Sequence, residues 1–141
     1  MGAVYKARDT RTDRLVALKV LLPWGSSSEE VCERFLREAF CASNVQHPGI
    51  VQVFEADAID GQMYIAMELV EGESLDRLIR RRGSKPGDVE EGIQVMLGVA
   101  EALAAAHESR IIHRDIKPGN ILISAVDVPK LTDFGLARNL A

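Results

Sequence analysis

Aromatic residues, cysteines and long apolar runs are all scarce in this chain of 141 residues. Phe, Trp and Tyr make up only 5% of it, so a core must be built mainly from Leu, Ile, Val and Ala. The two cysteines, Cys32 and Cys41, fall in one predicted helix and point in different directions, which argues against a disulfide scaffold. We expect neither a signal peptide nor a membrane span, because no apolar run of the necessary length exists.

An excess of basic charge is lacking as well. The 17 Lys and Arg residues are outnumbered by 21 Asp and Glu residues, which gives a net charge of −4. Because nucleic acids and anionic membranes favour a basic face, we expect neither as a partner. A hydrophobic content of 47% is otherwise typical of a globular protein.

The first half of the chain predicts mainly strands, with one helix between them. We expect strands over residues 3–8, 15–22, 50–56 and 62–69, with a hairpin turn at Asp60-Gly61. Ser27 and Glu30 fit a capping box for a helix that runs to about Asn44. The apolar residues of that helix share one face: Val31, Phe35, Ala39 and Ala42.

The second half predicts mainly helix. Residues 71–73 are interpreted as a linker, and Ser74 as the N-cap of a short helix that runs to about Arg82. The run Arg80-Arg81-Arg82 is interpreted as a solvated helix end that suits the helix dipole, with substrate docking as the less favoured alternative. Short apolar pieces follow at 110–112, 121–123 and 130–131. This order predicts two lobes with a hinge between about Glu68 and Ser74.

Residues 89–108 show the clearest helical period in the chain. An apolar stripe follows one face of this predicted helix and consists of Ile93, Met96, Leu97, Ala100, Leu103, Ala104 and His107. We interpret His107 as a core histidine of that stripe.

The stretch from His113 to Asn120, followed by Asp133-Phe134-Gly135, can supply the parts that phosphoryl transfer needs. That reaction requires a group to orient the attacking hydroxyl, cations to spread the phosphate charge, and oxygen ligands to hold a metal cation. Asp115 can accept the hydroxyl proton, and Lys117 can contact the moving phosphate. Asn120 and Asp133 offer the hard oxygen ligands that Mg²⁺ prefers.

The order His-Arg-Asp-x-Lys-x-x-Asn followed by Asp-Phe-Gly resembles the eukaryotic-type protein Ser/Thr kinases, and bacterial members in particular. Val16-Ala17-Leu18-Lys19 is similar to the strand whose Lys grips the nucleotide phosphates in that family. Glu38 lies nineteen residues later, at the family's spacing for the carboxylate that pairs with this Lys. The pairing agrees with the cost of burying a Lys alone in an apolar strand.

The resemblance implies that ATP binds between the lobes together with Mg²⁺, or Mn²⁺ in its place. It implies metal ligands at Asn120 and Asp133, a phosphate-binding Arg114, and a structural His113 that stacks on Phe134. The remaining implied nucleotide contacts are Gly2 in the glycine-rich loop, Val4 and Ala17 above the adenine, Leu122 below it, the gatekeeper Met67, and the backbone of Glu68 and Val70.

The resemblance implies an α+β, protein-kinase-like two-lobed fold that is incomplete. The N-lobe would span residues 1–70 without its first strand, and residues 71–141 would begin a helical C-lobe that runs through Asp133-Phe134-Gly135. We therefore expect little or no kinase activity from the isolated chain. We also expect the stripe on residues 89–108 to be exposed and able to support self-association. ATP and a protein carrying Ser or Thr are the implied partners, in the cytoplasm, with any membrane anchor elsewhere in a longer protein.

Two other functions stay open. One is a truncated kinase module that binds ATP or a partner without catalysis, which the missing parts favour and the complete set of catalytic side chains opposes. The other is a small-molecule phosphotransferase of the antibiotic or choline kinase type, which also uses an Asp, an Asn five residues later and a further Asp. Arg114, Lys117 and the complete Asp-Phe-Gly sequence favour the protein kinase.

Overall fold

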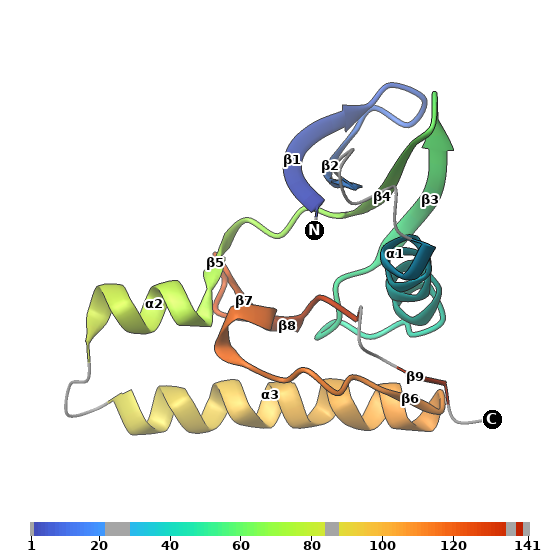
Figure 1. The fold of residues 1–141 in the computed structure, drawn as a ribbon. Coiled ribbons are helices and arrows are strands. Elements are labelled where there is room, and N and C mark those ends of the chain that lie inside the picture. The colour runs from blue at the N-terminus through green and yellow to red at the C-terminus, as the bar shows by residue number, and fades with distance from the viewer. Residues whose placement is uncertain (1, 22–28, 84–87, 135–137, 140–141) are drawn as a thin grey trace.

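A computed structural model describes residues 2–21, 29–83, 88–134 and 138–139 (Figure 1). A sheet with one helix forms one half of the molecule, and two further helices with short strands form the other (Figure 1). The expected α+β class is confirmed. Leu22, Ser27 and Gly135 carry parts of the sequence-based predictions and lie outside the described residues.

Four antiparallel strands make up the larger sheet, in the order β1-β2-β4-β3. The strands are β1 (Gly2–Asp9), β2 (Arg14–Leu21), β3 (Val53–Ile59) and β4 (Gln62–Glu68). Asp60 and Gly61 both have positive φ, at 51° and 76°, as a tight hairpin turn with right-handed strand twist requires. The strand β3 begins later than expected because Ile50 instead forms a bridge with Leu131 in the other half of the molecule.

The register of this sheet places several predicted site residues on one face. Val4 lies opposite Lys19, and Lys19 lies opposite Ile65 on the other side of β2. Ala17, two residues before Lys19, lies opposite Met67. Because directly paired residues project to the same side of a sheet, all five side chains share that face.

Helix α1 (Glu29–Ser43) covers this face with the residues that the sequence predicts. Phe35 and Ala39 pack in an apolar cluster with Leu21, Ile65 and Met67. Ala42, one turn further along the helix, belongs to a second cluster that includes Phe134. Helix α1 therefore contacts the cores of both halves of the molecule.

The segment predicted to be a linker at residues 71–73 contains a strand, so that prediction is wrong for Gly72 and Glu73. Strand β5 (Gly72–Ser74) pairs with β7 (Ile121–Ser124), which pairs with β8 (Pro129–Leu131). The two backbones approach so closely at Gly72 that an added Cβ would lie 1.9 Å from the carbonyl oxygen of Ile123. Tertiary pairing thus imposes a strand on three residues that carry no alternating pattern.

Helix α2 (Leu75–Arg82) has the ends that the sequence predicts. The Ser74 hydroxyl accepts a hydrogen bond from the backbone N–H of Arg77 at 3.3 Å, and Gly83 ends the helix with a φ of 67°. The chain then continues through α3 (Asp88–Glu108), β6 (Ile111–Ile112), a short 3₁₀ turn (Pro118–Asn120), β7 and β8 to β9 (Arg138–Asn139), which pairs with β6.

Helix α3 buries one narrow face, formed by Val95, Val99, Ala102 and Ala106. The predicted apolar stripe lies mostly on the outward side, where Ile93, Met96 and Leu97 are each more than half exposed. Its expected exposure is confirmed, but the interpretation of His107 as a core residue is wrong, because His107 lies on the exposed side. None of the helices in the described parts of the chain is long and apolar enough to span a lipid bilayer.

Substituting Gly72 by alanine should separate β5 from β7, since the new methyl group would overlap the Ile123 carbonyl. We expect a loss of about 1–3 kcal/mol in the free energy of unfolding, measured by urea denaturation. Gly92→Ala is the matched control, because nothing lies within 4 Å of a Cβ there and alanine favours a helix interior by about 0.5–1 kcal/mol. Equal stability of the two variants would contradict the close approach at Gly72.

Candidate active site

An ion pair between Lys19 on β2 and Glu38 on α1 lies at the centre of the site. The Lys19 ammonium contacts both carboxylate oxygens of Glu38, at 2.7 and 2.6 Å. The two side chains are only 18% and 10% exposed. Burial raises the pKa of the Glu38 carboxyl, and the neighbouring Lys19 charge partly opposes that rise. The structure therefore joins the two residues that the family's spacing pairs.

Asp133 brings the second half of the molecule to this ion pair. Its carboxylate lies 3.7 Å from the Lys19 ammonium and is about half exposed. Lys19 thus faces one buried carboxylate that holds it in place and one accessible carboxylate from the other half. Such an arrangement leaves the ammonium positioned to meet an anionic group of a ligand.

Two of the three predicted catalytic side chains, those of Lys117 and Asn120, contact the third, that of Asp115. The Lys117 ammonium lies 2.8 Å from the Asp115 carboxylate, and the Asn120 side-chain amide donates to the same carboxylate oxygen at 2.9 Å. The hydrogen bond from Lys117, followed by that from Asn120, holds the pKa of Asp115 below its usual range. The same contact raises the pKa of Lys117. Asp115 is thus an ionised acceptor and Lys117 a cation at neutral pH.

His113 is a neutral structural residue beneath this loop. Its ring is 1% exposed and lies 4.5 Å from the Phe134 ring, between centroids, in a tilted arrangement. The Nδ1 atom accepts from the backbone N–H of Asp115 at 3.3 Å, which leaves Nε2 as the donor to the Thr132 carbonyl at 2.9 Å. Burial lowers the pKa of His113, in agreement with this neutral tautomer. The expected contact with Phe134 is confirmed.

Asn120 and Asp133 fit a magnesium site that is completed by a ligand. The Asn120 side-chain nitrogen donates twice to Asp115, so its amide oxygen is the atom left to coordinate a cation. The backbone carbonyl of Asn120 accepts from the N–H of Thr132, which holds the loop beside Asp133. Within the described ranges, no group of three or more His, Cys, Asp or Glu residues could form a metal cage. One carboxylate and one amide suit Mg²⁺, which keeps waters and takes phosphate oxygens as further ligands.

The predicted apolar contacts of the nucleotide come from both halves of the molecule. Ala17, Val70 and Leu122 are partly buried and pack on the cluster that contains the buried Met67. Val4 shares the face of Lys19 but is 61% exposed, and Gly2 opens β1 opposite Leu21. Ala17 on β2 and Leu122 on β7 therefore pack on the same apolar cluster from the two halves of the molecule, while Val4 is largely exposed.

Two non-glycine residues of the site have backbone angles in the left-handed region. Arg114 has a φ of 66° and Asp133 a φ of 65°. Such angles cost of order 1–3 kcal/mol each and persist only where the surroundings impose them. Nothing in the residue pattern signals this strain, which falls at Asp133 itself and at the residue before Asp115.

Comparison with known proteins agrees with this geometry. The protein kinase domain family model matches residues 1–141, the whole chain. The chain belongs to this family. PrkC of Bacillus subtilis, a serine/threonine-protein kinase, is 42% identical over the entire chain, which covers 22% of its length. PknD of Mycobacterium tuberculosis, a serine/threonine-protein kinase, is 40% identical over 98% of the chain, which covers 20% of the length of PknD. A probable serine/threonine-protein kinase of Clostridium perfringens is 42% identical over 99% of the chain, which covers 20% of the length of that protein.

The chain spans about a fifth of the length of these relatives. Protein kinases in general use ATP and a divalent metal ion. Like those of other kinases, this site draws its cationic and carboxylate groups from both halves of the fold.

A contact that the sequence analysis missed ties the halves of the kinase together beside the slot. The Lys130 ammonium on β8 lies 2.8 Å from the Glu68 carboxylate at the end of β4. The other Glu68 oxygen accepts from the backbone N–H of Gln52 at 3.3 Å. Lys130 is a lysine in an apolar strand, the same signal that drew attention to Lys19. The ion pair holds Glu68, whose backbone the resemblance assigns to the edge of the adenine.

Replacing Lys19 by methionine should leave the Glu38 carboxylate buried without its partner. Its pKa, already raised by burial, should rise further once the opposing Lys19 charge is gone. The pKa of this carboxyl is then higher in the folded chain than in the unfolded chain, where it is near 4.5. Its protonation stabilises the fold fully at pH values below 4.5, and this stabilisation is lost as pH rises through the pKa of the folded state. We expect Lys19→Met to cost up to about 3 kcal/mol at pH 7 and to recover relative to wild type as pH falls toward 5.

The double variant Lys19→Met/Glu38→Leu is the control for this experiment. It removes both charges, so chemical denaturation at pH 7 should show most of the lost stability restored. A double variant no more stable than Lys19→Met, or a Lys19→Met loss independent of pH, would show that the ion pair does not determine the effect.

Proposed function

We propose that this chain forms the nucleotide-binding and phosphoryl-transfer centre of a protein Ser/Thr kinase. The observation that carries the proposal is the Lys19–Glu38 ion pair with the Asp133 carboxylate 3.7 Å from the same ammonium. Phosphoryl transfer depends on positioned charges rather than on covalent chemistry of the protein. A cation held by one buried carboxylate and adjoined by an accessible one is suited to bind the phosphates of a metal–nucleotide complex.

In this proposal ATP binds in the slot between the halves of the molecule. Ala17 and Val4 cover one face of the adenine and Leu122 the other, with Met67 behind it and the backbone of Glu68 and Val70 along its edge. Gly2 lies near the phosphates, which Lys19 holds. Asn120 and Asp133 would hold Mg²⁺, or Mn²⁺, which would neutralise part of the phosphate charge.

Asp115 then orients the Ser or Thr hydroxyl of a protein substrate for in-line attack on the γ-phosphate. Its lowered pKa makes it a weak base in the ground state, so it accepts the hydroxyl proton as the phosphoryl group transfers. Lys117 is cationic and contacts Asp115, from where it can reach the transferring phosphoryl oxygens. Arg114, which is exposed, is assigned to a phosphate on the activation segment.

The same proposal divides the chain into an N-lobe over residues 1–70 and the start of a C-lobe over 71–141. Because the proposed reaction uses ATP, the proposal includes a cytoplasmic location for the kinase domain. A binding module without catalysis is the alternative. The intact contacts among Asp115, Lys117 and Asn120 favour catalysis over that alternative.

Asp115→Asn in the full-length protein should lower kcat by roughly 10²–10⁴ and leave the KM for ATP nearly unchanged, since Asp115 acts on the hydroxyl rather than on the nucleotide. Transfer of labelled phosphate from Mg-ATP to a Ser/Thr peptide measures both constants. Asp127→Asn, in the turn between β7 and β8, is the matched control and should keep wild-type activity. Unchanged kcat in Asp115→Asn would refute the role of Asp115. Thermal stabilisation of the wild type by Mg-ATP with no turnover would instead support the binding module.

We further propose that the outward face of α3 lets the 141-residue chain self-associate. Ile93, Met96 and Leu97 form an exposed apolar patch on that face. Met96→Glu/Leu97→Glu should shift the chain toward monomer in sedimentation velocity runs, because carboxylates cannot be buried in an apolar contact. Gln94→Glu, at an exposed position of the same helix, should leave the distribution unchanged. A wild-type chain that stays monomeric at all concentrations would contradict the proposal.

A further inference from the structure

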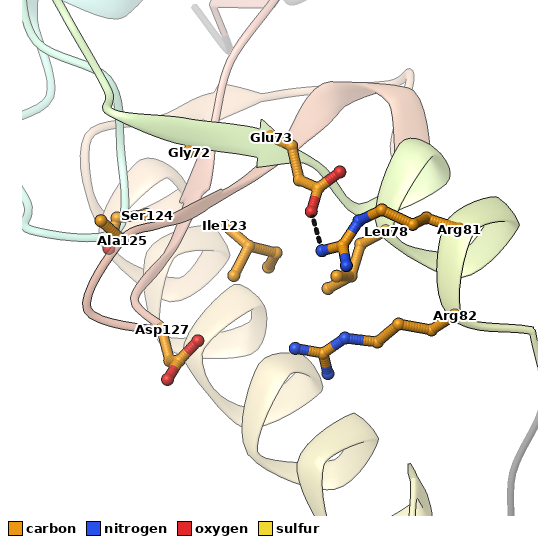
Figure 2. Close-up of a pocket in the computed structure, with 9 residues that line it drawn as sticks. All are labelled: Gly72, Glu73, Leu78, Arg81, Arg82, Ile123, Ser124, Ala125 and Asp127. Atoms are coloured by element: carbon orange, nitrogen blue, oxygen red, sulfur yellow. Dashed lines mark hydrogen bonds and ion pairs between the residues drawn. The ribbon is translucent and has the colours of Figure 1, made fainter.

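The lysine on β8 projects toward the half of the molecule that contains the larger sheet. Lys130 pairs with Leu122 on β7, so their two side chains lie on the same side of the small sheet. On that side Leu122 packs against the cluster that contains Met67. Ile123, the next residue of β7, projects to the other side, where it lines a cavity of about 370 Å³ together with Leu78 (Figure 2). Lys130 therefore lies on the side of the proposed nucleotide slot.

The partner of this lysine, Glu68, ends β4 and is held by three contacts. The Lys130 ammonium lies 2.8 Å from one carboxylate oxygen, and the two side chains are only 16% and 30% exposed. The other carboxylate oxygen accepts from the backbone N–H of Gln52 at 3.3 Å. The backbone N–H of Glu68 donates to the Gln52 carbonyl at 2.8 Å. With this N–H engaged, the backbone group that Glu68 can offer to a ligand is its carbonyl, an acceptor.

These contacts belong to a closed ring of interactions that joins β4 to β8. Leu131, the residue after Lys130, exchanges two backbone hydrogen bonds with residues 49–51, at 2.7 and 2.9 Å. Gln52 continues that segment and bonds Glu68. The ion pair between Lys130 and Glu68 closes the ring. It therefore restricts how the end of β4 lies relative to β8.

The segment that connects the two halves is anchored to the β7-β8 pair at both ends. At its start, Glu68 contacts Lys130 on β8. At its end, the Glu71 carbonyl accepts from the backbone N–H of Ala125, just after β7, at 2.7 Å. Residues 69–70 alone lie between these two anchors. Loss of the first anchor would therefore loosen the direction of the Glu68 carbonyl.

We propose that Lys130 is a positioning residue for base recognition, which holds Glu68 so that its carbonyl accepts a hydrogen bond from the 6-amino group of adenine. A carbonyl in this place selects an amino group, which is a donor, over the 6-oxo group of guanine, which is an acceptor. The inference rests on the proposed ATP site and names a residue that sets its preference for a 6-aminopurine. The partly buried Lys130 pair suits this role because it is shielded from water. The exposed pair of Lys6 with Glu71, at 4.0 Å, restrains the same segment little.

Binding of ADP and of purine riboside diphosphate to the full-length protein, with Mg²⁺, tests this role. The second ligand lacks the 6-amino group, and neither carries a γ-phosphate, so binding is measured without turnover. Isothermal titration calorimetry should show that the wild type binds ADP more tightly. Lys130→Met should weaken ADP roughly 3–10-fold, the worth of about one hydrogen bond, and purine riboside diphosphate by less than about twofold.

Further variants separate positioning of the carbonyl from general stability. Lys130→Arg keeps a cation within reach of Glu68 and should retain most of the preference for ADP. Glu68→Gln should reproduce the loss seen in Lys130→Met, and the double variant should lose no more than either single variant, because both remove the same contact. Lys6→Met is the matched control, since it removes the lysine of the exposed pair with Glu71 and should change neither affinity.

Equal weakening of both nucleotides in Lys130→Met would show a purely structural role and overturn the inference. A wild type that binds both nucleotides equally would also overturn it, since the Glu68 carbonyl would then not read the base, while the proposed nucleotide site would stand. A wild type that binds neither nucleotide would overturn the proposed function and this inference together. Circular dichroism spectra that match the wild type establish that the variants are folded, and Glu68→Gln carries the test if Lys130→Met does not fold.

Discussion

The buried ion pair between Lys19 and Glu38 is the interaction on which the site depends. An ammonium among the apolar residues of β2 requires a partner, and the only way for Glu38 to reach it is for α1 to lie against the sheet. That placement buries Phe35 and Ala39 in the core beneath the sheet. It also carries Ala42 to the second cluster, next to Phe134. One charge pair therefore sets the position of the helix that connects the two halves.

The small sheet β5-β7-β8 connects the proposed nucleotide slot with the proposed catalytic loop. Leu122, proposed to cover one face of the adenine, packs on the cluster that contains Met67, and Asn120, just before β7, holds Asp115 by two hydrogen bonds. Lys130 on β8 contacts Glu68 at the end of β4. A shift of β7 would therefore change the floor of the slot and the catalytic loop together.

Sequence alone predicted which side chains of the candidate site lie together better than it predicted the fold around them. Lys19, Glu38, Asp115 and Asp133 are identifiable because the chemistry requires particular groups at particular spacings. Strand β5 was missed because Gly72, Glu73 and Ser74 form a strand only through pairing with β7, a tertiary effect with no local pattern. The environment of His107 was misassigned because α3 is apolar on two sides, so periodicity identifies the helix but not its buried face.

The candidate site depends on backbone conformation at Arg114 and Asp133 as well as on the chemistry of its side chains. Both residues have a positive φ without being glycine, and His113 lies between the segments that carry them. Its ring bonds the backbone on each side, at Asp115 and Thr132, while Phe134 covers it. A protonated imidazole could not accept the Asp115 N–H, so the neutral state of His113 is needed for the contact on the Asp115 side, while Nε2 donates to Thr132 in either state. The His113 ring thus bonds the backbone next to both carboxylates proposed to act in phosphoryl transfer, and burial, which lowers its pKa, favours the neutral form that makes both bonds.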